Sequence, residues 1–128
     1  MREAGRTHVT DSFKLLLPFF TPRTVFMHVG AGDGALALLA ASYVERVYAI
    51  GVTQKFARHP RLPTNLRFAW PRYGEVDVAF SERPQPQWAE QIRATLASGG
   101  KYFVLGAPPA DGFIGKLFSK TRLVASIQ

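Results

Sequence analysis

Residues 25–34 read Val-Phe-Met-His-Val-Gly-Ala-Gly-Asp-Gly, and this stretch decides the fold class of the chain. A mostly apolar segment runs into glycines at alternate positions, and an Ala- and Leu-rich segment, 35–43, follows at once. The order predicts a buried strand, a tight turn and the start of a helix. Glycine lacks a Cβ, so its backbone can approach a ligand closely, and a new helix offers unpaired N–H groups. The stretch therefore indicates either a nucleotide-cofactor site or a tight turn without a ligand.

The composition is that of an ordinary globular domain. The chain has 128 residues, of which 47% are hydrophobic and 20% charged, so we expect a single domain over 1–128. It contains no cysteine, which excludes disulfides, thiolate zinc sites and a cysteine nucleophile. No apolar run reaches the length of a membrane span, and residues 1–6 lack the apolar segment of a signal peptide. We expect a cytoplasmic protein with no membrane partner.

The net charge of +7 is concentrated in one part of the chain. Residues 46–72 contain no acid, and their basic residues are Arg46, Lys55, Arg58, Arg61, Arg67 and Arg72. Such a cluster can meet the phosphates of nucleic acid or of a small ligand, or it can be a solvated face. We favour the solvated face, because no aromatic-interleaved binding pattern accompanies the charges. Nucleic acid is therefore a partner that the sequence does not favour.

The periodicity of apolar residues predicts the secondary structure. After a loosely ordered 1–9, a helix begins at Thr10 or Asp11 and ends near Pro18 and Pro22. The remaining helices are expected at 35–43, from Thr53 or Gln54 to before Pro60, at 87–97, and at 113–118. Strands are expected at 25–29, 47–50, 66–70, 76–80, 102–105 and 121–127, with a loop at 106–112. Asp33 is expected to cap the helix over 35–43, whose inner face carries Leu36, Leu39, Ala40 and Tyr43.

Short, continuous apolar strands that alternate with helices or loops are typical of a parallel sheet covered on both faces. The predicted fold is a Rossmann-like, doubly wound, mostly parallel α/β sheet of five to six strands. Ligands of such sheets sit beyond the carboxyl ends of the strands. The segments expected at that edge are Gly30–Gly34, Gly51–Gln54, Trp70, Ser81–Pro84 and Gly106–Pro108.

Over residues 24–107 the chain resembles the class I S-adenosylmethionine-dependent methyltransferases. The motifs that carry the resemblance are VGAGDG at 29–34, RVYAI at 46–50, NLRF at 65–68, VDVAFS at 76–81 and IRATLASGGKYFV at 92–104. The resemblance implies S-adenosylmethionine as the cofactor, with the glycine loop against its methionine half and Ala69 and Trp70 near its adenine ring. Trp70 either stacks on the purine or covers an edge of the core. The candidate cofactor-binding residues are Gly30, Ala31, Gly32, Asp33, Gly34, Gly51, Thr53, Ala69, Trp70 and Ser81.

The chain departs from the family at two acids that usually grip the cofactor. His28 stands two places before the first glycine, and Gly51 stands at the end of the second strand. A hydrogen bond to a charged group contributes roughly 1.5–3 kcal/mol, so each loss weakens binding by about one to two orders of magnitude. Thr53 or Gln54 are partial substitutes for the acid at position 51, whereas His28 is interpreted as a core histidine. The cofactor site is therefore expected to be weakened or lost.

Few residues suggest catalysis. Glu82, after the fourth strand, is the candidate general base, although a solvated loop residue is the favoured interpretation, and Asp77 is expected near the strand start, too far from the site. Residues 81–84 do not match the Asn/Asp-Pro-Pro-aromatic motif of amino-methylating nucleic-acid enzymes. His8, His28 and His59 lack metal-ligand spacing, so no metal is expected, and there is no nucleophile elbow or P-loop.

Three functions compete. The favoured one is a methyltransferase-fold pseudoenzyme, a non-catalytic or partner-dependent binding or scaffold protein. The second is an active small S-adenosylmethionine-dependent methyltransferase completed by dimerisation. The third is an NADP-binding Rossmann domain, because Gly30-x-Gly32-x-x-Ala35 fits the dinucleotide fingerprint and Lys55 and Arg58 suit a 2′-phosphate.

The resemblance also implies more sheet than the chain supplies. Family members continue past the fifth strand with two more strands, whereas only residues 107–128 remain here. An incomplete sheet leaves an edge that needs cover. We therefore expect a homodimer or a partner protein at the sheet edge.

Overall fold

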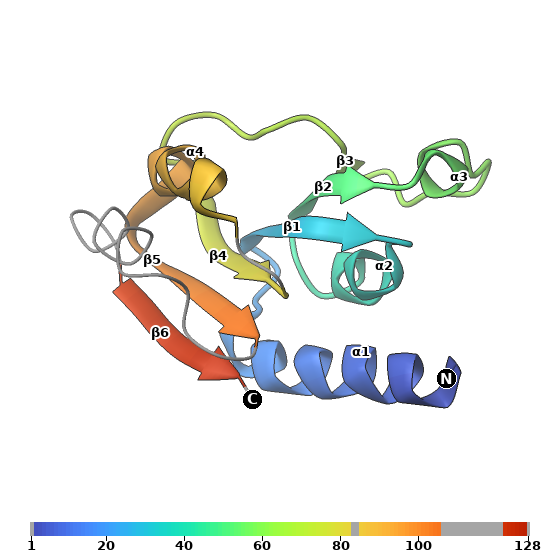
Figure 1. Cartoon of the computed structure of the whole chain (residues 1–128). Helices are drawn as coiled ribbons and strands as arrows, with labels where there is room; N and C mark the ends of the chain where they lie inside the picture. Colours follow the sequence, from blue (N-terminus) through green and yellow to red (C-terminus); the bar gives the residue numbers. More distant parts are fainter. Residues whose placement is uncertain (1, 83–84, 106–121, 128) are drawn as a thin grey trace.

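The computed structural model describes residues 2–82, 85–105 and 122–127, which form a six-stranded sheet in the order β3-β2-β1-β4-β5-β6 (Figure 1). The strands are β1 (Val25–Gly32), β2 (Arg46–Val52), β3 (Leu66–Arg67), β4 (Val76–Ser81), β5 (Leu96–Leu105) and β6 (Arg122–Ile127). Each neighbouring pair is parallel. This order, with its reversal between β1 and β4, is that of the Rossmann fold, which confirms the predicted fold class.

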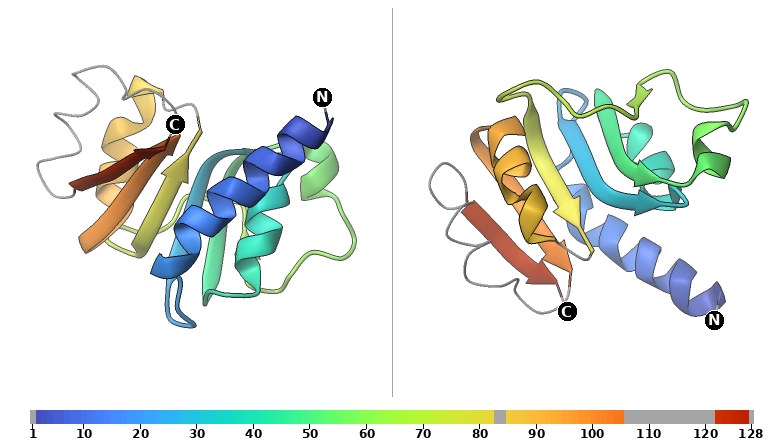
Figure 2. Two further views of the ribbon diagram at one scale, coloured as in Figure 1. Left: turned by 90° about the horizontal axis from the view of Figure 1, so that it is seen from below. Right: turned by 45° about the horizontal axis from the view of Figure 1, so that its top comes forward.

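Helices cover both faces of the sheet. They are α1 (Arg2–Leu16), α2 (Ala35–Ala41), α3 (Gln54–Ala57) and α4 (Ala89–Thr95), with 3-10 turns η1 (Leu17–Phe19) and η2 (Pro86–Trp88). Figure 2 shows α1 and α2 side by side on one face and α4 on the other. No helix within the described ranges is long and apolar enough to cross a membrane.

The core forms two layers, one on each side of the sheet. Phe26, Phe80 and Phe103 point toward α1 and α2, where they meet Leu16 and Leu36. The alternate residues point toward α4, and that layer includes Met27, Val29, Ile92, Tyr102 and Val104. Because β1 is buried on both faces, its apolar run is continuous rather than alternating.

The first helix is longer than the sequence predicted. α1 begins at Arg2, so residues 2–9, expected to be loosely ordered, are helical, and the expected start at Thr10 or Asp11 is wrong. No proline interrupts the chain before Pro18, so the capping signal at Thr10 and Asp11 competes with an uninterrupted helix. The predicted end is confirmed, since α1 stops at Leu16 and η1 contains Pro18.

The inner face of α2 is partly different from the predicted one. Leu36 and Ala40 are buried as expected, but Leu39 and Tyr43 are 42% and 49% exposed. Ala37 and Ala41 take their place against the sheet, because small side chains let the helix pack closely. Tyr43 lies beyond the helix end, where its ring is 5.3 Å from that of Phe13 in α1.

β3 is shorter than predicted and ends at Arg67 instead of Trp70. Phe68 leaves the sheet to contact Phe56 of α3, and Trp70 turns over the core layer on the α4 side. The following residues, 71–75, lead to β4 without a helix. The contacts of Phe68 and Trp70 outside the sheet thus end the strand. The loop after β3 covers part of the α4 side of the sheet, which a crossover helix would otherwise cover.

The helix predicted over 87–97 ends at Thr95, and β5 begins at Leu96 rather than at Tyr102. Val76 pairs with Leu96 and Val78 with Lys101, so residues 97–100 form an irregularity within the strand. Gly99, with φ +79°, supplies the left-handed conformation that this irregularity requires. β6 confirms the expected last strand, while the expected loop at 106–112 and helix at 113–118 lie outside the described residues.

Two carboxylates join the strands at the amino edge of the sheet. Asp77 accepts the N–H of Val25 at 2.9 Å, so it lies at the start of β1, away from the glycine loop. Glu75 accepts hydrogen bonds from Arg46 (2.9 Å), Tyr48 (2.6 Å) and the backbone N–H of Arg72 (2.9 Å). Partial burial raises the pKa of Glu75, but these hydrogen bonds outweigh it and hold the pKa below its ordinary value.

Candidate functional site

The glycine loop lies at the carboxyl end of β1, and two of its glycines face open space. Gly30 and Gly32 have φ of +84° and +56°, and a Cβ added to either would meet nothing within 4 Å. The loop is held by the end of β2, because Gly32 pairs with Val52 and its carbonyl accepts the N–H of Thr53 at 2.9 Å. There is room beside Gly30 and Gly32 for a ligand to approach the backbone.

The surroundings of Gly34 differ from those of Gly30 and Gly32. Its φ is +77°, and a Cβ added there would overlap the ring of Phe56, which comes from α3. The glycine therefore makes space for a core side chain, because the ring of Phe56 occupies the place of a Cβ. The predicted contact of Gly34 with a cofactor stays a prediction.

Asp33 binds the start of α2, although the N-cap position predicted for it is taken by Gly34. Its Oδ1 accepts the N–H of Ala35, the first residue of the helix, at 3.0 Å. The carboxylate is exposed and places a negative charge at the helix start, which opposes the binding of a phosphate there. Its neighbour Ala31 is only 5% exposed and packs into the core.

Gly51 lies directly beside the glycine loop. Its φ is +74°, and a Cβ added to it would lie 3.4 Å from the Cα of Gly30. An acid at this position would have to adopt a left-handed backbone that L residues rarely adopt. An acid in the place of Gly51 would therefore bring backbone strain.

Thr53 is already engaged in the fold. Its Oγ1 accepts the N–H of Phe56 at 3.2 Å and caps α3, and its own N–H is bonded to Gly32. The hydroxyl proton of Thr53 remains available to a ligand, but the oxygen is fixed by the cap. Gln54 is exposed as the first residue of α3.

His28 is confirmed as a core histidine. It is 2% exposed, and its ring centroid is 5.2 Å from that of Phe80. Burial lowers its pKa to about 4, although Asp33 acts in the opposite direction, so the ring is neutral near pH 7. Within the described part of the chain neither ring nitrogen has a hydrogen-bond partner.

The other candidate residues lie at the end of β4 and in the chain after β3. Ser81 is fully buried beside Tyr102; burial raises the pKa of Tyr102, and the hydrogen bond with Ser81 offsets part of that rise. Trp70 is half-buried against the core, while Ala69 is exposed. Glu82 is half-buried and follows the last residue of β4. The structure thus brings together Gly30, Gly32, Gly51 and Thr53. Ser81 lies on the neighbouring strand in register with Val29, but its side chain is buried.

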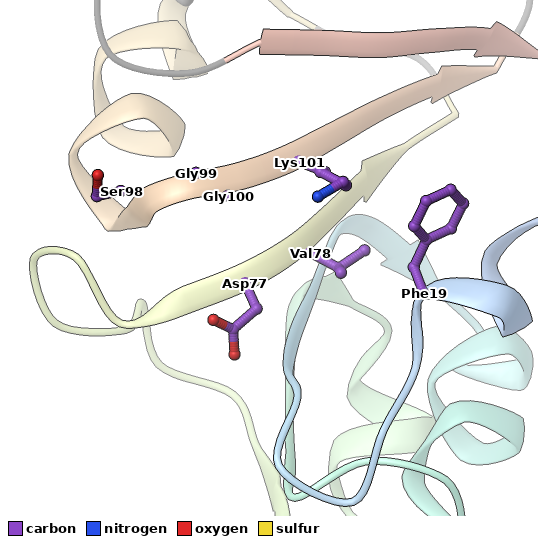
Figure 3. Close-up of a pocket in the computed structure, with 7 residues that line it drawn as sticks. All are labelled: Phe19, Asp77, Val78, Ser98, Gly99, Gly100 and Lys101. Atoms are coloured by element: carbon purple, nitrogen blue, oxygen red, sulfur yellow. The ribbon is translucent and has the colours of Figure 1, made fainter.

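The sequence did not predict a cavity of about 200 Å³ at the amino end of β4 and β5 (Figure 3). Its lining residues are Phe19, Asp77, Val78, Ser98, Gly99, Gly100 and Lys101. They come from separate segments, η1, β4 and the first half of β5, so no local motif announces them. The cavity lies at the edge opposite the glycine loop, and its carboxylate already binds the N–H of Val25.

Within residues 2–82, 85–105 and 122–127, no cluster of three or more His, Cys, Asp or Glu side chains could hold a metal ion. No protein-family model and no curated protein matches this chain.

Proposed function

We propose that this chain is a non-catalytic binding protein built on a methyltransferase-like fold, with a cofactor site that is weakened or lost. The observation that carries the proposal is the conformation of Gly51. At the position where the resemblance implies an acid on the ribose hydroxyls, the backbone is left-handed and lies against Gly30. The site lacks the carboxylate, and its backbone has a conformation that an acid would adopt only with strain.

The state of His28 supports the same conclusion. A neutral ring inside the core replaces the second acid that the resemblance implies, and it offers nothing to a cofactor. Losing two charged hydrogen bonds, at roughly 1.5–3 kcal/mol each, weakens binding by about two to four orders of magnitude. Thr53 does not replace them, because its oxygen caps α3.

The test is calorimetry of the full chain with S-adenosylhomocysteine. We expect no binding at millimolar ligand, and no methyl transfer from S-adenosylmethionine by the purified protein. The matched variant is Gly30→Ala, which fills the open space beside the loop. Micromolar binding that Gly30→Ala abolishes would contradict the proposal and favour the active methyltransferase.

An NADP-binding domain is the second candidate, and the strand order favours it. β6 pairs directly and in parallel with β5, as in the order 3-2-1-4-5-6 of dinucleotide-binding domains. Exposed Lys55 and Arg58 follow Gly51, which has no acid to repel a 2′-phosphate. Against it, Asp33 places a negative charge where the pyrophosphate would bind.

Titration with NADPH and NADH, followed by tryptophan fluorescence, distinguishes this candidate. The binding protein proposed above gives no saturable quenching with either. Saturable quenching by NADPH alone that Arg58→Ala weakens at least tenfold would identify the NADP-binding domain instead.

A further inference from the structure

The basic residues of segment 46–72 divide into paired and unpaired groups. Arg46 forms an ion pair with Glu75 at 2.9 Å. Arg67 is exposed and uses Nη1 on the carbonyls of Thr64 and Leu66, which leaves its other N–H groups available. The remaining basic side chains are exposed and form no hydrogen bond or ion pair within the described ranges; they are Lys55, Arg58, Arg61 and Arg72.

Aromatic side chains are interleaved with these cations. Because β3 has only two residues, Phe68 leaves the sheet and is 37% exposed, and Tyr73 is 72% exposed. The ring of Phe68 stands edge-on against Phe56 at 5.8 Å, so it is held next to α3. The sequence prediction placed Phe68 within a strand over 66–70 and did not favour a nucleic-acid partner.

The segment that carries these residues passes from one end of the strands to the other: α3 follows the carboxyl end of β2, and Arg72 and Tyr73 precede the amino end of β4. Figure 1 shows the chain after β3 running from the side of α3 across to α4, and Figure 2 shows the same path from another direction. The far end is anchored by the bond from the N–H of Gly74 to the carbonyl of Ala94, at 2.9 Å. We call Lys55, Arg58, Arg61, Arg67, Phe68, Arg72 and Tyr73 the β3 edge surface.

Glu75, the acid whose carboxylate binds the backbone N–H of Arg72, does not oppose an anion at the β3 edge surface. Both oxygens of Glu75 accept hydrogen bonds, and its side chain is only 18% exposed. Segment 46–72 itself contains no Asp or Glu. The surface therefore combines unneutralised cations with exposed aromatic rings.

We propose that the β3 edge surface binds single-stranded nucleic acid. Lysine and arginine side chains neutralise the phosphates, and Phe68 and Tyr73 stack on unpaired bases, which recognises a single strand without regard to sequence. A duplex keeps its base faces in the stack and offers the rings nothing. This inference rests on the proposed function, since it names a partner for a binding protein, but it uses residues outside the glycine loop.

The test is fluorescence anisotropy of labelled dT15, and of a duplex of the same length, with the full chain between 50 and 200 mM KCl. The single strand binds more tightly than the duplex, and its affinity falls with salt. Tyr73→Ala weakens binding of dT15 roughly tenfold, whereas Tyr73→Phe retains it. Arg72→Ala lowers the logarithmic salt slope by about 0.7.

Lys14→Ala is the matched control, because Lys14 is exposed on α1, away from the β3 edge surface. Equal affinity for duplex and single strand, an unchanged affinity in Tyr73→Ala, or an equal loss in Lys14→Ala would each overturn the proposal, as would binding only to phosphatidylserine vesicles. The outcome is independent of the calorimetry with S-adenosylhomocysteine. Failure to bind dT15 rejects this inference alone, and binding of S-adenosylhomocysteine rejects the proposed function alone.

Discussion

At the residue scale, glycines that share a positive φ serve different purposes. Gly34 and Gly74 have φ of +77° and +68°, but only Gly34 has a neighbour, the ring of Phe56, in the place of a Cβ. We expect Gly34→Ala to lower the free energy of unfolding by about 2–5 kcal/mol, because left-handed strain adds to overpacking. Urea unfolding measures the effect.

Gly74→Ala is the control for backbone strain alone and is expected to cost about 1–2 kcal/mol. Equal losses of unfolding free energy in the two variants would show that overlap with Phe56 adds nothing to the cost of a Cβ at Gly34.

His28 predicts a dependence of stability on pH. Its folded pKa of about 4 lies below the ordinary value of 6.5, so between these values the unfolded chain binds more protons. The contribution of His28 to the free energy of unfolding is complete above pH 6.5. It falls by about 3 kcal/mol as the pH drops to about 4. Unfolding by urea at pH 7, 5.5 and 4 measures the loss.

His28→Leu is expected to remove most of that slope, while His59→Gln, which changes an exposed histidine, retains it. A slope that persists in His28→Leu would assign the acid sensitivity to other groups.

At the scale of elements, Glu75 joins β2 to the loop before β4. It accepts hydrogen bonds from Arg46, Tyr48 and the Arg72 backbone, so Glu75→Ala leaves the largely buried Tyr48 without its acceptor. We expect a loss of about 1–2 kcal/mol in thermal or urea unfolding.

Glu90→Ala is the matched control. Its ion pair with Arg93 is longer, at 3.6 Å, and the Glu90 side chain is 64% exposed, so little change is expected. A similar loss in both variants would argue against a specific role of the Glu75 hydrogen bonds.

At the scale of the whole molecule, the protein carries a net charge of +7, and the unpaired cations near β3 repel one another. Added salt screens that repulsion, so we expect the unfolding temperature to rise between 10 and 300 mM NaCl. Arg58→Glu should reduce the rise, and Lys14→Glu, away from the cluster, should reduce it less. A fall in unfolding temperature with salt would show that attractive ion pairs dominate.

The expected homodimer or partner protein at the sheet edge stays a prediction.

The sequence by itself determined the unit from β1 through the glycine turn to α2, and the series of parallel strands. These features depend on neighbouring residues: apolar runs specify buried strands, alternate glycines permit the turn, and Asp33 accepts the first N–H of the helix that follows. The sequence also showed that positions 28 and 51 hold no acid.

Only the tertiary structure decided what surrounds those residues. Phe56 fills the space at Gly34, Thr53 is used as a cap, and β3 stops early, so that Phe68 leaves the sheet and is partly exposed. The cavity beside Asp77 is likewise assembled from distant segments. Burial and contact depend on which distant segments meet, and a periodic pattern within a short window reports only which face of an element is apolar.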